Sequence, residues 1–336
     1  MILIDSTYIN SFGGKTLLEL LIQKSNTLDF YFLLDDRIEL NDFKPYLNKN
    51  YTIIKSNHFN RLKFYQTNFI SFSSVVCLSN VPPPIKNKMK TIVYFHNKLL
   101  LNPFEHELSL KNQIINFFKN IYIRYYSYKD YHWIVQTPLM KKLIQSYLKL
   151  DSNHCHVYPF FRLELNKSFF KKTCNNFVFI SSSVSHKNHK RLIKAFIEAA
   201  KNTNEEIKLH VTLNKEELPK SVFPKNLKVE FHGTLSLDAV NELYNSCEFA
   251  IYPSLVESFG LPLIEAAQHD CKVIASDLSY VHEIIEPSLT FDPYSVESIS
   301  TSILKAISEN LPKTKVLVEN KLDNFIEFII SQNVQQ

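Results

Sequence analysis

The stretch from Ala250 to Glu265 reads AIYPSLVESFGLPLIE, and it combines a short apolar strand, a loop and the start of a helix. Glu257 lies in the loop, and Glu265 lies about a turn and a half into a helix that begins near Gly260. Gly260 is one of only four glycines in the chain, and a residue without a Cβ lets backbone N–H groups approach a ligand closely. The stretch therefore predicts a strand, a ligand-binding loop and a helix in succession.

The same alternation of short apolar runs with amphipathic stretches continues through both halves of the chain, as is typical of helices that cover a mostly parallel sheet. The sequence therefore predicts an α/β protein with two doubly wound, Rossmann-like domains. In the first half, strands are expected at Ile2–Ile4, Phe30–Leu34, Tyr51–Ile54, Val75–Leu78, Ile92–Phe95, Ile134–Val135 and His156–Tyr158. In the second half, they are expected at Phe177–Ile180, Lys208–Thr212, Lys228–Phe231, Ala250–Tyr252, Val273–Ala275 and Leu289–Phe291.

The length of 336 residues exceeds the roughly 250 to 300 residues at which a single core stops growing. The segment Pro159–Asn176 has no clear periodicity, so we place the domain junction there. We expect domains over residues 1–160 and 161–315, followed by a terminal segment over 316–336. Because ligands of open α/β sheets bind at the carboxyl ends of strands, a ligand cleft between two such domains is expected.

Composition and cysteine use are those of a globular protein of a reducing compartment. Hydrophobic residues make up 45% and charged residues 21% of the chain. The five cysteines are scattered and include no C-x-x-C pair, which favours reduced thiols and a cytoplasmic location. The N-terminus lacks the pattern of a signal peptide, and no apolar run is long enough to span a bilayer.

The net charge of +5 is unevenly distributed along the chain. Residues 1–160 carry a net charge of +8, and the remainder carries −3. This asymmetry favours an anionic partner for the first half, either a membrane surface or a phosphate-bearing substrate. No recognition motif supports binding to nucleic acid.

The two glutamates of the opening stretch suit a nucleotide-sugar. Carboxylates accept hydrogen bonds from paired sugar hydroxyls, and amides at a helix N-terminus attract phosphate. One loop could therefore hold both ends of such a ligand. Two glutamates eight residues apart also arise by chance, and it is the residues around and between them that favour function.

With these residues the chain resembles the retaining GT-B glycosyltransferases of family four, whose signature is a Glu, seven residues and a second Glu. The resemblance covers about residues 177–292. Four segments follow the family's order and spacing: Phe231–Leu235 (FHGTL), a helix at Ser236–Cys247, YPSLVESFGLPLIEA and VIASDLSYVHEII.

The resemblance implies site roles. Glu257 would contact hydroxyls of the donor sugar, Phe259, Gly260 and Leu261 would offer backbone amides to sugar and phosphate, and Glu265 would hold the ribose. Gly233 and Leu235 of the FHGTL segment would also line the donor site.

The resemblance also implies the reaction. The donor would be a nucleotide diphosphate sugar, and the acceptor would be a hydroxyl of a glycan or lipid-linked glycan. Transfer would occur with retention of configuration, without a cofactor or a bound metal, in the synthesis of a surface polysaccharide such as lipopolysaccharide. GT-B chains also often end by crossing back to the first domain, which the helix expected at Lys321–Ile330 could do.

The loop after Phe177–Ile180 supplies a cation for the diphosphate. It places Lys187 and Asn188 just before a helix, where the family usually has a Lys-Asn pair. A fixed cation stabilises a leaving diphosphate more in the transition state than in the ground state. Many members carry an arginine a few residues earlier, where this chain has serines including Ser182, so hydroxyls and amides would complete the clamp. The alternative is a solvated basic helix start.

Two further candidates lie in the first half. Gly13 and Gly14 follow the first strand and precede a helix, where amides can cup a phosphate or sugar. A P-loop would need glycine at Ile9. His96 ends a strand near the expected cleft and would lie close to the donor sugar by the resemblance, although a lone histidine is as often structural.

Residues His154, Cys155 and His156 do not predict a metal site, because neighbours along a strand point to opposite faces. Residues 111–129 carry an apolar stripe at helical spacing with interspersed lysines and an arginine. Core packing is the favoured interpretation of that stripe, and peripheral contact with an anionic membrane, at the inner face of the cytoplasmic membrane, is the alternative.

Two other function classes stay open at this point. A nucleotide-sugar epimerase or hydrolase of the same fold would act on donor without acceptor. A non-catalytic nucleotide-sugar-binding partner would bind donor without turning it over.

Overall fold

The computed structural model describes residues 1–10, 12–24, 28–39, 43, 45–47, 50–86, 89–104, 110–163, 172–218 and 221–334. These residues form two compact units. The first unit contains the described residues up to Arg162 together with those from Glu319 onward, and the second contains those from Leu163 to Val318. Part of the expected junction, residues 164–171, lies outside the described residues.

The first unit is built on a seven-stranded sheet in the order β3-β2-β1-β4-β5-β6-β7, with every neighbouring pair parallel. Apolar residues cover both faces of this sheet, as expected when helices lie on both sides. The strands are β1 Ile2–Asp5, β2 Phe30–Asp35, β3 Tyr51–Ile54, β4 Ser74–Cys77, β5 Lys90–Tyr94, β6 His132–Val135 and β7 Cys155–Val157.

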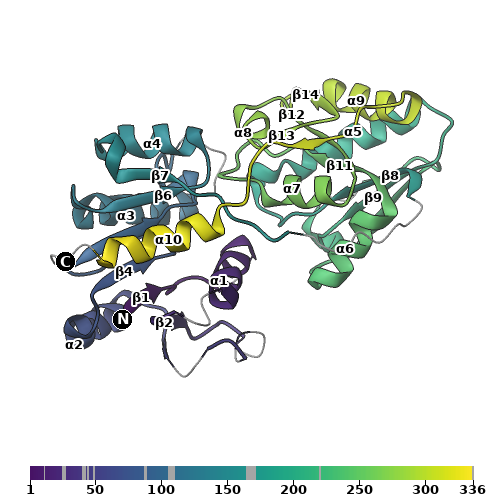
Figure 1. The fold of residues 1–336 in the computed structure, drawn as a ribbon. Coiled ribbons are helices and arrows are strands. Elements are labelled where there is room, and N and C mark those ends of the chain that lie inside the picture. The colour runs from purple at the N-terminus through teal and green to yellow at the C-terminus, as the bar shows by residue number, and fades with distance from the viewer. Residues whose placement is uncertain are drawn as a thin grey trace. The chain divides into compact units, whose positions relative to one another are not determined.

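Five α-helices accompany this sheet among the described residues: α1 Phe12–Lys24, α2 His58–Asn68, α3 Leu110–Tyr126, α4 Pro138–Leu148 and α10 Leu322–Val334. The last helix, α10, packs on this sheet (Figure 1). In the sequence, the whole second unit lies between α10 and the strands of the sheet. Phe325 of α10 is fully buried in the same core as β1 and β5, and Lys321 N–H donates to Pro159 O at 2.7 Å just before the helix.

The second unit repeats the same topology. Its six-stranded parallel sheet has the order β10-β9-β8-β11-β12-β14. The strands are β8 Thr173–Phe179, β9 Ile207–Val211, β10 Leu227–Phe231, β11 Cys247–Tyr252, β12 Lys272–Ser276 and β14 Leu289–Phe291. The α-helices are α5 His189–Lys201, α6 Leu237–Ser246, α7 Leu261–Gln268, α8 Ser279–His282 and α9 Val296–Ser308.

The predicted fold class is confirmed, since both units are doubly wound parallel sheets. Each strand expected from the sequence is present, with ends that differ by up to four residues. The sequence reasoning missed the short antiparallel pair β13 Ile285–Glu286 and β15 Lys315–Val316. Two-residue strands carry no periodicity by which they could have been found.

The core-packing interpretation of residues 111–129 is wrong for most of the stripe. Ile123 is the one buried side chain of α3, a helix that is described throughout. We call the exposed apolar residues of this helix the α3 stripe; their exposed fractions run from 40% to 76%. They are Leu110, Ile114, Ile115, Phe117, Phe118, Ile121 and Tyr125.

Two expectations about compartment and membrane can be compared with the structure. Each of the five cysteines is unpaired, and four of them are buried. Among the helices that the structure describes, none is both long and apolar enough to cross a bilayer.

Candidate functional site

The loop from β11 to α7 is shaped by Gly260. Its φ of 82° lies in the left-handed region, and Gly260 serves as the N-cap of α7. A Cβ there would also meet Leu263 Cδ1 at 3.0 Å. Pro262 follows in the first turn, where its missing N–H costs nothing and its fixed φ favours the helix. The loop thus leads from Glu257 to the positive end of α7, which begins four residues later.

Lys187 and Glu257 form an ion pair within the second unit. Lys187 Nζ lies 2.5 Å from Glu257 Oε1, and the two side chains are 14% and 17% exposed. The backbone links their two loops as well, since Leu255 N–H donates to His186 O at 2.8 Å. Both loops leave the carboxyl ends of the neighbouring strands β8 and β11. The structure therefore brings the two predicted catalytic residues of this unit together.

Asn188 supports the loops that carry Lys187 and Glu257. Its backbone is left-handed, with φ 64°, where a short helical turn at Ser185–Lys187 meets α5. Its buried side-chain amide donates to Pro253 O at 3.1 Å and to Pro293 O at 2.7 Å. The side chain predicted to bind donor thus ties together the loops that follow β8, β11 and β14.

Glu265 lies in α7, as expected, and is half-buried. Two tyrosines support the first turn of this helix. The Tyr244 and Tyr252 hydroxyls lie 2.8 Å apart, and Tyr252 donates to Pro262 O at 3.0 Å. Burial raises the pKa of Tyr252 well above its ordinary value, and the Glu265 carboxylate adds to the effect. Both tyrosines therefore stay neutral donors beside Glu265.

Gly233 meets a backbone requirement in the loop after β10. Its φ is 63°, and a Cβ would lie 2.8 Å from Asn214 Oδ1. Its N–H donates to Leu213 O at 3.0 Å, which joins the loops that follow β9 and β10. Leu235 is half-buried just before Ser236, the N-cap of α6.

The remaining predicted residues of this unit lie beside these loops. Leu261 is half-buried at the start of α7, and Phe259 is 4% exposed in the loop before it. Ser182 O lies 3.0 Å from His189 Nε2, so the Ser182 backbone is fixed against α5.

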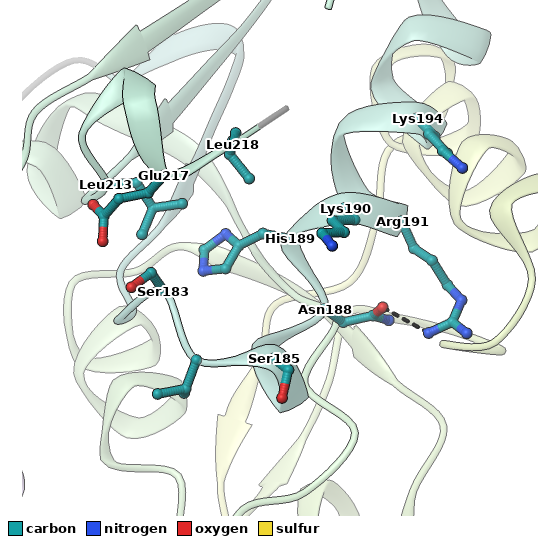
Figure 2. A pocket seen from close by; sticks show the side chains of 11 residues that line it. Ser183, Ser185, Asn188, His189, Lys190, Arg191, Lys194, Leu213, Glu217 and Leu218 are labelled. Atoms are coloured by element: carbon teal, nitrogen blue, oxygen red, sulfur yellow. Dashed lines mark hydrogen bonds between the residues drawn. The ribbon is translucent and has the colours of Figure 1, made fainter. Parts of the chain in front are cut away.

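A hollow of about 310 Å³ opens beside the N-terminus of α5 (Figure 2). Lys190, Arg191 and Lys194 line it from α5, and Glu217 lines it from the loop after β9. Glu257, Gly260 and Glu265 are not among its lining residues. Sequence reasoning missed Glu217, because nothing in the sequence around it signals that the loop after β9 meets α5.

Three predicted residues lie in the first unit. Gly13 and Gly14 form the first turn of α1 and not a loop before it. A Cβ on Gly14 would lie 3.4 Å from Ile9 Cγ2 and 3.9 Å from His96 Cε1, so Gly14 and His96 are neighbours.

His96 follows β5 and is held by the β4 loop. Its backbone N–H donates to Asn80 Oδ1 at 2.6 Å, and its Nε2 lies 3.0 Å from Leu78 O. Burial lowers the pKa of His96 to about 4, so the ring is neutral near pH 7. Asn80 Nδ2 also lies 3.2 Å from His96 Nε2, so the ring is anchored through this nitrogen.

These loops now have a family context. Residues 161–323 match the model of the family "Glycosyl transferases group 1". This part of the chain is a group 1 glycosyltransferase domain. Lys187, Gly233, Glu257 and Glu265 all lie inside the matched residues of the glycosyltransferase.

Individual proteins that are similar to this glycosyltransferase are also named as sugar transferases. The O-antigen chain mannosyltransferase RfbU of Salmonella typhimurium is 26% identical over 250 residues, which cover 67% of this chain and 69% of RfbU. Among solved structures, a glycosyltransferase from Rickettsia africae has a TM-score of 0.64 at 14% identity, over 100% of this chain and 98% of that one. The lipopolysaccharide outer core galactosyltransferase WaaB has a TM-score of 0.62 at 14% identity, over 98% and 99%. The two Rossmann-like units therefore have the GT-B fold.

Proposed function

We propose that this glycosyltransferase moves a sugar from a nucleotide diphosphate sugar to a hydroxyl of a glycan or lipid-linked glycan, with retention of configuration. The observation that carries the proposal is the Lys187–Glu257 pair at the carboxyl ends of β8 and β11. It places a cation just before α5 and a carboxylate in the loop that leads into α7, as a leaving diphosphate and a polyhydroxylated sugar require.

Donor binding would exchange the partners of this pair. The diphosphate carries more negative charge than one carboxylate and would take Lys187 Nζ as its counter-ion. Glu257 would then be free to accept hydrogen bonds from sugar hydroxyls, and Glu265 would do the same for the ribose. Because negative charge grows on the diphosphate as the glycosidic bond breaks, Lys187 stabilises the transition state most.

If Glu257 binds the sugar and does not attack it, retention requires a substitution on one face of the sugar. The bond from C1 to the phosphate oxygen breaks, and the bond from C1 to the acceptor oxygen forms on the same face. The acceptor proton passes to the departing phosphate oxygen. Since Lys187 supplies the counter-charge, the step needs no metal ion. The neutral His96 would accept or donate one hydrogen bond in the first unit.

The relative RfbU suggests where this reaction belongs. It is named for the transfer of mannose to O-antigen chains. We therefore propose a role in the synthesis of a surface polysaccharide such as lipopolysaccharide, with a nucleotide diphosphate mannose as the first donor to test. A lipid-linked acceptor would place the enzyme in the cytoplasm, at the inner face of the cytoplasmic membrane.

The α3 stripe suits such a location. It pairs exposed apolar side chains with Lys111, Lys119 and Arg124 on the same helix, all of them exposed. Apolar groups can enter the boundary between headgroups and acyl chains, while cations attract anionic headgroups. The helix would lie on the bilayer and not cross it.

The proposal is tested with purified protein and a panel of nucleotide-sugars, with and without a membrane extract as the source of acceptor. Release of nucleoside diphosphate that rises with acceptor and is lost in Glu257→Gln supports a transferase and identifies the donor. Release or isomerisation of the sugar without acceptor would instead indicate a hydrolase or epimerase. Donor binding with no turnover under any condition would overturn the proposal in favour of a binding protein.

A further inference from the structure

Three side chains of metal-ligand type converge at one edge of the second sheet. β10 is the edge strand and pairs with β9 so that Glu230 lies beside His210. His232 follows two residues after Glu230, so it returns to the same face of the sheet. His210 is 8% exposed, His232 24% and Glu230 44%, so the cluster runs from the interior to solvent.

The spacing of the three ligand atoms matches a tetrahedral metal site. His210 Nδ1 lies 3.0 Å from His232 Nε2 and 3.3 Å from Glu230 Oε2, and His232 Nε2 lies 3.9 Å from Glu230 Oε2. A zinc ion binds such atoms at about 2.0 to 2.2 Å, which sets tetrahedral ligand atoms about 3.3 to 3.6 Å apart. Shifts of a few tenths of an ångström, together with a rotation of both rings, would let all three atoms bind one ion.

The groups around the cluster also favour this use. The two imidazole rings lie nearly parallel and edge to edge, with planes 16° apart and centroids 5.2 Å apart, so that His210 Nδ1 and His232 Nε2 face each other. Lys208 Nζ holds the other carboxylate oxygen of Glu230 at 3.1 Å, so Oε2 remains for the histidines. A hydrogen-bonded partner of this kind commonly orients a ligating carboxylate.

We propose that His210, Glu230 and His232 bind a divalent transition metal, zinc first of all, with a fourth position open to solvent. Two imidazoles and one carboxylate are a zinc ligand set that leaves such a position. These residues are distinct from Lys187 and Glu257. Removing the metal with a chelator should therefore leave the proposed metal-independent transfer unchanged, provided that the protein stays folded.

A bound ion would join the edge strand to its neighbour. Immediately after the ligands, His232 N–H donates to Val211 O and Gly233 N–H donates to Leu213 O, each at 3.0 Å. Leu213 lines the hollow beside α5. The metal would therefore stabilise the two loops that follow β9 and β10.

The test uses the full chain, purified through a tag without histidines, stripped with a chelator and titrated with zinc chloride in a calorimeter. We expect one zinc per chain and a rise in Tm of about 5 to 10 °C at a hundredfold excess over Kd. Cobalt in place of zinc should give the visible absorption of a four- or five-coordinate ion.

Glu230→Gln and His232→Gln should each weaken zinc binding at least tenfold, and their Tm without zinc reports whether they fold. His156→Gln is the matched control, since His156 Nε2 lies 3.2 Å from His132 Nδ1 in a histidine pair of the first unit. Zinc binding by the His156→Gln variant should equal that of the wild type. No stoichiometric zinc, or equal binding by wild type and both ligand variants, would overturn the proposal and leave a hydrogen-bonded histidine pair beside a surface ion pair.

Discussion

Lys187 Nζ lies 2.5 Å from Glu257 Oε1, although the two residues are 70 positions apart in the chain. They meet because β8 and β11 are adjacent and parallel, so that the loops at their carboxyl ends share one edge of the sheet. The sequence predicts each of the two residues for the site, but it does not predict the contact between them. Under the proposed function, their direct contact means that the donor would have to break an existing ion pair.

Lys187→Met should lower turnover more than donor affinity. Loss of one fixed group that stabilises developing charge costs about 10²- to 10³-fold in kcat. The effect on donor affinity is smaller, because in the free enzyme the lysine already has Glu257 as its partner. Steady-state release of nucleoside diphosphate against donor concentration separates the two. A variant with unchanged kcat would exclude Lys187 from the reaction.

A second ion pair of the same unit provides the matched control. Lys272 Nζ lies 3.0 Å from Glu248 Oε1, and these side chains are 20% and 24% exposed, close to the burial of the Lys187–Glu257 pair. Lys272 is the first residue of β12 and Glu248 is the second of β11, so they lie at the amino-terminal ends of the strands, away from the site. Lys272→Met should leave kcat within about twofold. An equal loss in both lysine variants would point to stability and not to chemistry.

Glu265→Ala should weaken donor binding while leaving turnover at saturating donor nearly unchanged. The ribose lies away from the reacting bond, so its contact contributes equally to the ground state and the transition state. Loss of a charge-assisted hydrogen bond of about 1.5 to 3 kcal/mol corresponds to roughly ten- to hundredfold in Kd. Calorimetry with the nucleoside diphosphate measures it directly. A fall in kcat with unchanged Kd would refute the ribose assignment.

Gly260→Ala should destabilise the second unit and weaken donor binding. A left-handed backbone with a Cβ costs about 1 to 2 kcal/mol, and the contact with Leu263 adds to it. Gly14→Ala is the control for stability, because Gly14 lies in a helix and its new Cβ would make only ordinary contacts. That change should raise stability by about 0.5 to 1 kcal/mol. Urea unfolding of both variants tests this, and equal shifts would contradict it.

Acid should destabilise the second unit through His189. Burial lowers the pKa of His189 to about 4, against 6.5 for an exposed histidine, and the side chain is 5% exposed. Between these values the unfolded chain binds a proton that the folded chain does not. The contribution of His189 to the free energy of unfolding is therefore fully present above about pH 6.5. It is lost as the pH falls towards 4, by up to about 3 kcal/mol.

The pH effect is measured by urea unfolding at about pH 7 and about pH 5. His189→Asn should lose less stability than the wild type over this interval. A residual loss is expected, because burial also lowers the pKa of His210, in the same unit, to about 4. Identical losses in variant and wild type would show that His189 is not a source of the acid sensitivity.

The α3 stripe should bind vesicles that contain anionic lipid. Phe118 is 63% exposed, and Phe118→Ser removes a large apolar group from the contact. We expect a lower bound fraction in vesicle flotation and weaker binding at high salt. Phe59→Ser is the control, because Phe59 is 79% exposed on a different helix of the same unit. Equal binding by both variants would exclude the stripe as the docking surface.

The strands were predictable because buried parallel strands read as short apolar runs, which need no partner to be recognised. The stretch Ala250–Glu265 was predictable for a related reason, since its strand, loop and helix start are contiguous. Contacts between segments were not. The Lys187–Glu257 pair and the His210–Glu230–His232 cluster depend on which strands are neighbours and on their register.

At α3, hydrophobic periodicity predicts the helix but not the burial of its side chains. The spacing of Ile114, Phe118, Ile121 and Tyr125 correctly predicts a helix with one apolar face. It does not say whether protein covers that face. The structure leaves those side chains exposed, because the buried contact of α3 with its sheet is made through Ile123.

The packing of α10 on the first sheet bears on how the chain is synthesised. Phe325 and Ile329 complete a core whose strands are all synthesised before the second unit. The first unit therefore stays unfinished until α10 has emerged, whereas every element of the second unit is available before that. Folding during translation should thus run against the order of the sequence, with the later unit becoming protease-resistant first. Nascent chains that stop before Leu322 should show a protected second unit and a still-digestible first one.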